Sequence, residues 1–293
     1  MLIKKLCWLI FFIYHCILLK SIIKDMNNKV VVITGASSGI GKSLTSEYAY
    51  AGYKVVIAAR NEKKLLDLSE NFIRKGFEVY AVTTDISKKA DCKNLIKKAI
   101  AEYGKIDILI NNAGVSMRAI FEEMDLKVLK YLMDVNFWGT VFCTKYALPY
   151  LLESEGSVVG VSSIAGYKGL PGRTGYSASK FAIHGFLETL RTENLKKNLH
   201  VLIACPGFTN TNIRKTALGK DGNEQGETPR DEDKMMSSEE VASRIRKAVD
   251  KRKRSLILTT QGKMTVLLNK LFPKYMDKLV YNHMAKEPDS PFK

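Results

Sequence analysis

The sequence predicts an α/β protein built on a doubly wound sheet of seven mainly parallel strands, with helices on both faces. From Lys29 onward, short apolar runs alternate with longer segments of helical character, which is the pattern of consecutive β-α-β units. Several of these runs consist almost entirely of Val, Ile and Leu, as expected for strands that helices cover on both faces. The 293 residues suffice for one large domain with short additions at its ends.

The predicted elements alternate along the chain. Strands are predicted at 30–34, 54–59, 78–83, 106–110, 157–162, 201–205 and 255–258. Helices are predicted at 40–51, 62–75, 88–103, 125–153, 175–198 and 238–251. The polar, charged segment 219–234 follows the sixth strand and cannot bury enough surface to order itself, so we expect a flexible loop at the ligand edge of the sheet. A lid over the ligand and a plain mobile insertion both fit this position.

The composition is that of a globular protein with a strong basic surplus. Hydrophobic residues make up 46% and charged residues 26% of the chain, so it can bury a core. The net charge of +16 favours anionic partners such as phosphorylated cofactors, acidic lipid surfaces or nucleic acid. Aromatic residues are not interleaved with the basic ones and no nucleic-acid-binding motif occurs, so we expect no nucleic-acid partner.

The cysteines predict no metal site. None of them falls in a CxxC or Cys/His spacing, so we expect no metal and interpret all five as reduced thiols. The sequence contains no Asn-x-Ser/Thr acceptor, which favours a cytosol-facing domain. The cysteines are Cys7, Cys16, Cys92, Cys143 and Cys205.

Residues 1–25 form an apolar N-terminal segment. The run 6–19 is shorter than the roughly 17 to 25 apolar residues of a spanning helix, although Ile22 and Ile23 lengthen it. No small-residue cleavage site follows, so we predict a signal anchor or an interfacial anchor that attaches a cytosol-facing domain to a membrane. The alternative is a soluble cytoplasmic protein that starts at Met26, because the sequence from Met26 onward opens a complete domain by itself.

The segment TGASSGIG, after the first strand, predicts a phosphate site. Gly35, Gly39 and Gly41 remove Cβ atoms where the chain must turn tightly and approach a pyrophosphate. The N-terminus of the following helix offers free N–H groups and a partial positive charge to the same group. The strand, the glycines and the helix together indicate nucleotide binding.

These residues resemble the short-chain dehydrogenases/reductases. TGASSGIG is similar to the cofactor motif of that family, and NNAG at 111–114 resembles its segment that stabilises the sheet beside the cofactor. The likeness extends over about 29–262 and implies a Rossmann-type catalytic domain, 27–262, that binds a nicotinamide cofactor. The cofactor contacts that it implies in the two segments are Gly35, Ser37, Ser38, Gly39, Ile40, Gly41, Asn112, Ala113 and Gly114.

The end of the second strand favours NADP(H). In the family, an acidic residue at this place binds the free 2′-hydroxyl of NAD, but this chain has Ala59 there and Arg60 next. A guanidinium without a nearby carboxylate should bind a 2′-phosphate. Ser38 stands where many NADP-binding members carry a second basic residue. Asp85, with Ile86 behind it, resembles the contact at the adenine edge.

The segment YSASK places Tyr176 and Lys180 on one face of a helix. The resemblance implies that Tyr176 is the general acid/base and that Lys180 favours its phenolate and binds the nicotinamide ribose. It also implies that Ser163, 13 residues before Tyr176, bonds the substrate oxygen, whereas the Ser162 side chain is predicted to point to the opposite face. Asn136 resembles the fourth catalytic residue, which holds a water relay to the lysine.

The segment CPGFTNT follows the sixth strand. Pro206, Gly207 and Thr211 match the family loop that holds the nicotinamide carboxamide, and so complete the predicted cofactor contacts. Apolar residues expected to face the pocket suggest a small, hydrophobic carbonyl or alcohol as substrate. They are Met117, Tyr167, Leu170, Phe208 and Ile213.

Residues 263–293 form a basic tail. Beyond Pro273, the residues Met276, Leu279, Val280 and 283–284 recur at helical spacing with lysines on the other side, which predicts an amphipathic helix. It would pack on the domain or on a second subunit, or lie on an anionic membrane. We also expect a homo-oligomer, either a dimer or a tetramer.

Other functions fit part of the pattern. A catalytically silent NADP-binding sensor or scaffold would keep the glycine loop and lose part of the catalytic set, but all four candidates are present here. An epimerase or dehydratase shares the tyrosine and lysine but needs a larger substrate domain. Within the family, the apolar N-terminus and the Ala59-Arg60 pattern resemble the membrane-attached hydroxysteroid and lipid-ketone reductases.

Overall fold

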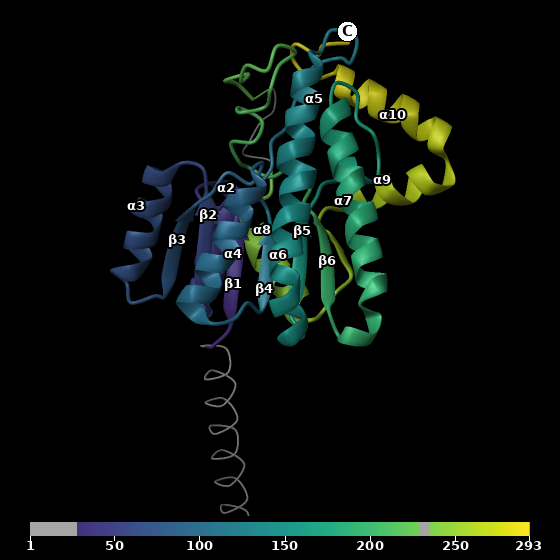
Figure 1. Ribbon diagram of the computed structural model, residues 1–293. Coiled ribbons are helices and arrows are strands. Elements are labelled where there is room, and N and C mark those ends of the chain that lie inside the picture. Colours follow the sequence, from purple (N-terminus) through teal and green to yellow (C-terminus); the bar gives the residue numbers. More distant parts are fainter. Residues whose placement is uncertain (1–27, 229–234, 293) are drawn as a thin grey trace, which may run out of the picture.

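The computed structural model describes residues 28–228 and 235–292, and their centre is one sheet of seven parallel strands (Figure 1). The order across the sheet is β3-β2-β1-β4-β5-β6-β7. The chain reverses its direction of winding between β1 and β4, which is where such sheets bind their ligands. The strands are β1 (Val30–Thr34), β2 (Lys54–Ala59), β3 (Val79–Thr83), β4 (Ile108–Asn111), β5 (Ser157–Val161), β6 (His200–Cys205) and β7 (Ser255–Ile257).

Helices pack on both faces of the sheet, which confirms the predicted doubly wound fold. The layer in front of the sheet in Figure 1 consists of α4 (Lys89–Tyr103), α6 (Gly139–Glu153) and α7 (Thr174–Glu193). The layer behind it consists of α2 (Gly39–Tyr50), α3 (Glu62–Ile73) and α8 (Ser238–Asp250).

The central strands supply apolar side chains to both layers. In β1, Val31 and Ile33 pack with α2 and α3, whereas Val30 and Val32 pack with α4 and α6. All four side chains are at most 1% exposed. Because successive side chains of a strand point to opposite faces, a strand covered on both sides must be apolar throughout, as the sequence of β1 is.

The helix predicted at 125–153 is divided into three parts. α5 (Leu126–Leu132) continues into a π-helix, η1 (Met133–Trp138), and then into α6. π-Helical turns are frequent at functional sites, and η1 carries Asn136. The helix predicted at 175–198 ends at Glu193, and short 3-10 helices, η2 (Ile164–Gly166) and η3 (Leu195–Lys197), precede and follow it. The other predicted elements agree with the structure to within a few residues.

Two helices follow β7, and only the second was predicted. They are α9 (Thr260–Leu271) and α10 (Pro273–Ala285). One face of α10 is buried against the domain, as the packing interpretation of the tail required, through Met276, Val280 and Met284. Leu279 and His283, which the sequence placed on the same apolar face, are exposed instead. The predicted boundary at 262 falls inside α9.

Two predictions concern residues outside the described ranges. The predicted anchor at 1–25 lies outside them entirely. Of the loop predicted at 219–234, residues 219–228 are described, and they form hydrogen-bonded turns instead of an open loop: the Gly219 N–H donates to the Asn223 carbonyl at 2.7 Å, and the Gln225 N–H to that of Ala217 at 2.9 Å. Within 28–228 and 235–292, no helix is long and apolar enough to cross a membrane.

Candidate active site

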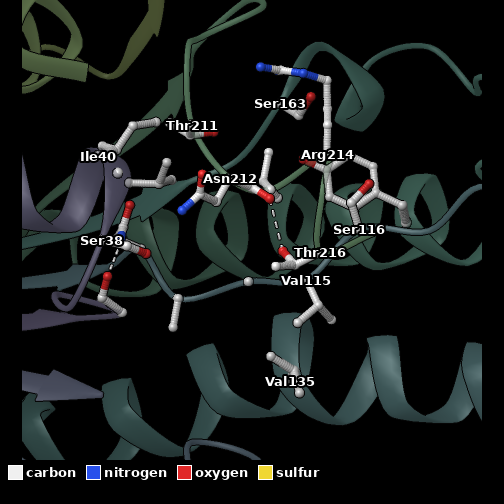
Figure 2. A pocket seen from close by; sticks show the side chains of 18 of the residues that line it. Ser38, Ile40, Val115, Ser116, Val135, Ser163, Thr211, Asn212, Arg214 and Thr216 are labelled. Atoms are coloured by element: carbon white, nitrogen blue, oxygen red, sulfur yellow. Dashed lines mark hydrogen bonds between the residues drawn. The ribbon is translucent and has the colours of Figure 1, made fainter. Parts of the chain in front are cut away.

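A cleft of about 810 Å³ opens at the carboxyl ends of the strands (Figure 2). Its volume lies in the range of roughly 300 to 1,000 Å³ that ligand sites occupy. The loops after β1 to β6 and the first turns of α7 line it. Figure 2 shows Ser38 and Ile40 on one side of the cleft, and Ser116, Ser163 and Arg214 on the other.

The NNAG segment holds the glycine turn in position. Gly35 has a φ of +66°, and a Cβ there would lie 2.7 Å from the Cα of Ala113, so only glycine fits. The Thr34 hydroxyl accepts hydrogen bonds from the N–H groups of Asn112 and Ala113 at 3.0 and 3.1 Å. The Asn112 side-chain amide donates to the Thr34 carbonyl at 2.9 Å. The turn after β1 is therefore fixed by the end of β4, its neighbour in the sheet.

The N-terminus of α2 borders the cleft. The Ser38 side chain occupies the N-cap without a capping bond in the described structure, so the N–H groups of the first turn keep their capacity for an anion. Gly41 does not line the cleft, and its predicted cofactor contact stays a prediction. A Cβ there would lie 2.1 Å from the Gly35 carbonyl oxygen, so this glycine allows α2 to pack on the turn. The lining residues from this segment are Gly35, Ser37, Ser38, Gly39 and Ile40.

Arg60 lies at the end of the cleft that the loops after β2 and β3 form, together with Asp85 and Ile86. Its guanidinium donates to the Tyr131 hydroxyl. Asp85 accepts hydrogen bonds from the N–H and hydroxyl of Ser87 at 3.1 and 2.7 Å, so its carboxylate is tied to its own loop. Lys64, four residues after Arg60, lines the same end and was missed in the sequence. This end thus carries two cationic side chains.

Three of the four predicted catalytic residues line the cleft together: Ser163 after β5, and Tyr176 and Lys180 on α7. The Lys180 ammonium donates to the Val161 carbonyl at 3.0 Å and lies 5.6 Å from the centre of the Tyr176 ring. The Ser163 hydroxyl lowers the pKa of the Tyr176 phenol, so the two groups lie close together. The hydroxyl, the phenol and the ammonium therefore belong to one wall of the cleft.

Burial dominates the acid–base properties of this wall. It raises the pKa of Tyr176, against a hydrogen bond from Ser163 and the charge of Arg173, both of which lower it. Burial also lowers the pKa of Lys180 to about 8, and Cys205 acts in the opposite direction. That Lys180 favours the Tyr176 phenolate stays a prediction.

Asn136 is fully buried and does not line the cleft. Its side-chain oxygen accepts from the Val115 N–H at 2.8 Å, and its amide nitrogen donates to the Val115 carbonyl and the Ser179 hydroxyl, both at 2.9 Å. A Cβ on Gly114 would lie 3.2 Å from this oxygen and 3.5 Å from the Lys180 nitrogen. Asn136 thus ties η1 to the chain after β4 and borders the same small space as Lys180.

Ser162 and Ser163 point to different surroundings, as predicted. The Ser162 hydroxyl forms a hydrogen bond of 2.8 Å with Nε2 of His184 in the core. Burial and then the charge of Lys180 lower the pKa of His184 to about 4, so this imidazole is neutral near pH 7. Of the two serines, Ser163 is the one that lowers the pKa of Tyr176.

The loop after β6 borders the glycine turn. Pro206, Gly207 and Thr211, the residues predicted to hold the carboxamide, line the cleft. A Cβ on Gly39 would lie 3.1 Å from the Thr211 methyl carbon, so this loop and the glycine turn approach each other closely. The predicted phosphate and carboxamide contacts therefore lie side by side.

Three of the five apolar residues predicted to face the pocket line the cleft, namely Leu170, Phe208 and Ile213. Met117 does not, because it is fully buried and its sulfur accepts a hydrogen bond from a backbone N–H of α7 at 3.3 Å. Tyr167 does not either, because its ring packs edge-on against His184 with the centroids 4.5 Å apart.

Two arginines on this side were missed in the sequence. Arg173 donates to the Met117 carbonyl at 2.6 Å, and Arg214 donates to the Thr209 carbonyl at 3.0 Å. Both line the cleft. Neither directly follows a strand, so the strand-end signal that located the other residues could not indicate them. Other lining residues that were missed include Asn61, Val115, Ser116, Tyr131 and Val135.

Comparisons with known proteins agree with this geometry. The model of the short chain dehydrogenase family matches residues 29–221. The "Dehydrogenase/reductase SDR family protein 7-like" of Dictyostelium discoideum is 35% identical, over 87% of this chain and 81% of its own length. The "11-beta-hydroxysteroid dehydrogenase A" of Sesamum indicum is 41% identical over 65% of this chain, which spans 55% of that relative.

A solved structure has the same fold. It is a short chain dehydrogenase/reductase from Burkholderia phymatum in complex with NAD, with a TM-score of 0.75 and 26% sequence identity. The match covers 84% of this chain and 94% of that one. The fold is therefore shared with a protein whose solved structure is a complex with NAD.

Proposed function

The chain belongs to the short-chain dehydrogenase/reductase family, and from this premise we propose that it is an NADP(H)-dependent enzyme that reduces a carbonyl, or oxidises a secondary alcohol, of a small hydrophobic substrate. Family membership makes it an oxidoreductase acting on CH-OH or C=O groups. The observation that carries the rest is that Ser163, Tyr176 and Lys180 line the same cleft as the glycine turn.

Tyr176 is the proton donor in this proposal. Reduction of a carbonyl leaves an alkoxide, which must receive a proton from a group held close to it. Tyr176 is partly buried beside Ser163, which would also donate to the substrate oxygen and stabilise its developing charge. Lys180 would bind the nicotinamide ribose. Asn136, whose side-chain oxygen lies beside Gly114 as the Lys180 nitrogen does, would keep Lys180 in position.

The residues of the cleft fit a dinucleotide. The glycine turn leaves a cradle that a Cβ on Gly35 would fill, and the start of α2 offers N–H groups to a pyrophosphate. Asp85, Ile86, Asn112 and Thr211 would complete the contacts. When bound, the nicotinamide supplies or accepts the hydride.

The phosphate-bearing cofactor is favoured by the charge at the adenosine end. Arg60 and Lys64 line this end, whereas the carboxylate of Asp85 is already bonded to Ser87. A guanidinium and an ammonium would stabilise a 2′-phosphate and gain little from a free hydroxyl. We therefore assign NADP(H) to the cleft.

We further propose that the protein associates with a membrane. The segment 1–25 would anchor it, with the catalytic domain facing the cytosol. The side of α9 and α10 that is not packed on the domain supports this, because it combines exposed apolar residues with lysines and projects beside α7 in Figure 1. Its apolar residues are Met264, Leu267, Leu271, Phe272, Tyr275 and Leu279, and its lysines are Lys263, Lys270, Lys274 and Lys278.

An oligomer is proposed from a second exposed surface. Trp138 at the end of η1 and Phe181 on α7 are 44% and 46% exposed, and the Trp138 ring stacks on Phe142 with centroids 5.5 Å apart. Large aromatic side chains on two neighbouring helices are typical of a subunit interface. A dimer or tetramer in solution, measured by light scattering, would become smaller in Trp138→Lys.

A substrate screen tests the proposed function. Aldehydes, ketosteroids, acyl ketones and quinones would be offered with NADPH, and the loss of NADPH absorbance followed. We expect turnover of at least one hydrophobic carbonyl compound. If the protein binds NADPH but reduces none of these classes, a sensor or scaffold explains it better.

A further inference from the structure

The end of the chain packs on the turn that begins the catalytic helix. Gly172, directly before Arg173, has a φ of +67°, and a Cβ there would lie 3.2 Å from a ring carbon of Pro291 and 3.5 Å from the Phe292 ring. Phe292 packs on the buried face of α10, and so does Leu170, which lines the cleft. Residues 287–292 thus pack directly behind residues that line the substrate side of the cleft.

A carboxylate in this segment lies between two arginines. Glu287 is only 6% exposed, and one of its side-chain oxygens lies 3.8 Å from Arg118 and 3.7 Å from Arg173. The two arginine side chains are 9% and 11% exposed. Arg118 also donates to the Pro288 carbonyl. Such an arrangement is strongly coupled, because charges that are buried together are poorly screened by water.

Arg173 connects this cluster to the chemistry. It lines the cleft, stands three residues before Tyr176, and donates to the Met117 carbonyl at 2.6 Å. Its positive charge lowers the pKa of the Tyr176 phenol, so its field reaches the atoms proposed to react. Removing the negative charge of Glu287, which partly neutralises Arg173, would therefore change the electrostatic potential at a bound substrate.

We propose that Glu287 acts through Arg173 as a built-in counter-ion that keeps the substrate side of the cleft suited to uncharged carbonyl compounds. This rests on the proposed function, because it concerns the substrate of the same site. Without the Glu287 charge, Arg173 would present a stronger positive potential to the cleft and would favour a substrate that bears a carboxylate. Glu287 does not line the cleft, so it is a positioning residue, not a catalytic one.

The test compares two aldehydes that differ in charge, 4-formylbenzoate and its methyl ester, in the full-length protein with NADPH. Glu287→Gln keeps the shape of the side chain and removes its charge. We expect the ratio of kcat/KM for the carboxylate to that for the ester to rise about threefold to tenfold, as one added charge near a partly solvated site allows. Asp289→Asn is the control, since Asp289 is an exposed carboxylate of the same segment, and should leave the ratio unchanged.

An unchanged ratio in a folded Glu287→Gln protein would overturn the proposal. If Glu287→Gln does not fold, the double variant Arg118→Gln with Glu287→Gln is used, because it removes one charge of each sign and leaves Arg173 without this carboxylate. The ratio of kcat/KM for the two aldehydes should then rise in the double variant, and an unchanged ratio would overturn the proposal. Binding of both aldehydes is also measured by calorimetry. If wild type reduces neither aldehyde, the proposed reduction of such carbonyls fails, whereas the binding ratio still tests the role of Glu287.

Discussion

The ammonium nitrogen of Lys180 lies 5.6 Å from the centre of the Tyr176 ring, one turn away on α7. It is held there by a hydrogen bond of 3.0 Å to the carbonyl of Val161, at the end of β5. The bond to β5 fixes the lysine independently of the tyrosine. Each residue can therefore be altered separately, and the effects on proton transfer and cofactor binding can be distinguished.

Tyr176→Phe should lower turnover by a factor on the order of 10² to 10⁴, because it removes the proton donor and little else. NADPH binding should remain nearly intact, whereas Lys180→Met should weaken both binding and turnover. Turnover and fluorescence titration measure the two effects. Tyr167→Phe is the matched control, because Tyr167 does not line the cleft. Substantial activity in Tyr176→Phe would refute the proposed mechanism.

The protein should bind NADPH more tightly than NADH by a factor on the order of 10 to 100, since a charge-assisted phosphate contact contributes about 1.5 to 3 kcal/mol. Fluorescence titration of both cofactors measures this ratio. Arg60→Asp should reverse or abolish the preference, whereas Arg74→Asp, an equal charge change at the far end of α3, should not. Equal affinities for the two cofactors in wild type would contradict the assignment of Arg60.

NADPH binding should weaken as the pH rises through about 8. Burial lowers the pKa of Lys180 to about 8, so the ammonium that we propose holds the ribose is present below this pH and lost above it. The measurement is kcat/KM for NADPH between pH 6.5 and about 9.5, which reports groups of the free enzyme. A flat profile over this range would show that the charge of Lys180 is not needed for binding.

The folded state should lose stability as the pH falls from about 6.5 towards 4. The pKa of His184 is about 4 in the folded protein, below its ordinary value, so the unfolded chain binds this proton first. His184 accounts for up to about 3 kcal/mol of the free energy of unfolding over this range. The free energy of unfolding is measured with urea at several pH values. Its decrease per pH unit should be smaller in His184→Gln than in wild type.

Burial also lowers the pKa of His200, so part of this decrease should persist in His184→Gln. If His184→Gln has the same pH dependence as wild type, the buried imidazole does not control acid stability.

The full-length protein should sediment with membranes and resist high salt, because apolar area would hold it there. A protein that begins at Met26 should be soluble, or attached only through α9 and α10 and released by salt. Replacing Leu267, Phe272 and Tyr275 with serine in the Met26 form should remove the remaining attachment. N-terminal sequencing of the native protein can contradict this prediction, since a product that starts at Met26 lacks the proposed anchor.

Local patterns in the sequence were sufficient for the fold and for most of the cleft. Apolar runs alternating with helical segments predicted the sheet, and Gly35, Gly39 and the Tyr176-Lys180 spacing indicated positions that the structure places at one edge of it. This succeeds because the carboxyl ends of parallel strands necessarily meet, so residues that follow strands are brought together by the fold itself.

Tertiary contacts decided the rest. Close packing of α2 on the glycine turn requires Gly41, and burial, a property of the folded state alone, raises the pKa of Tyr176. No local pattern joins Glu287 to Arg173, because their contact depends on how α9 and α10 fold back over the domain. Spacing along a chain determines which face a residue shares, but the surroundings of that face are set by segments distant in sequence, and these fix the charge and solvation of the site.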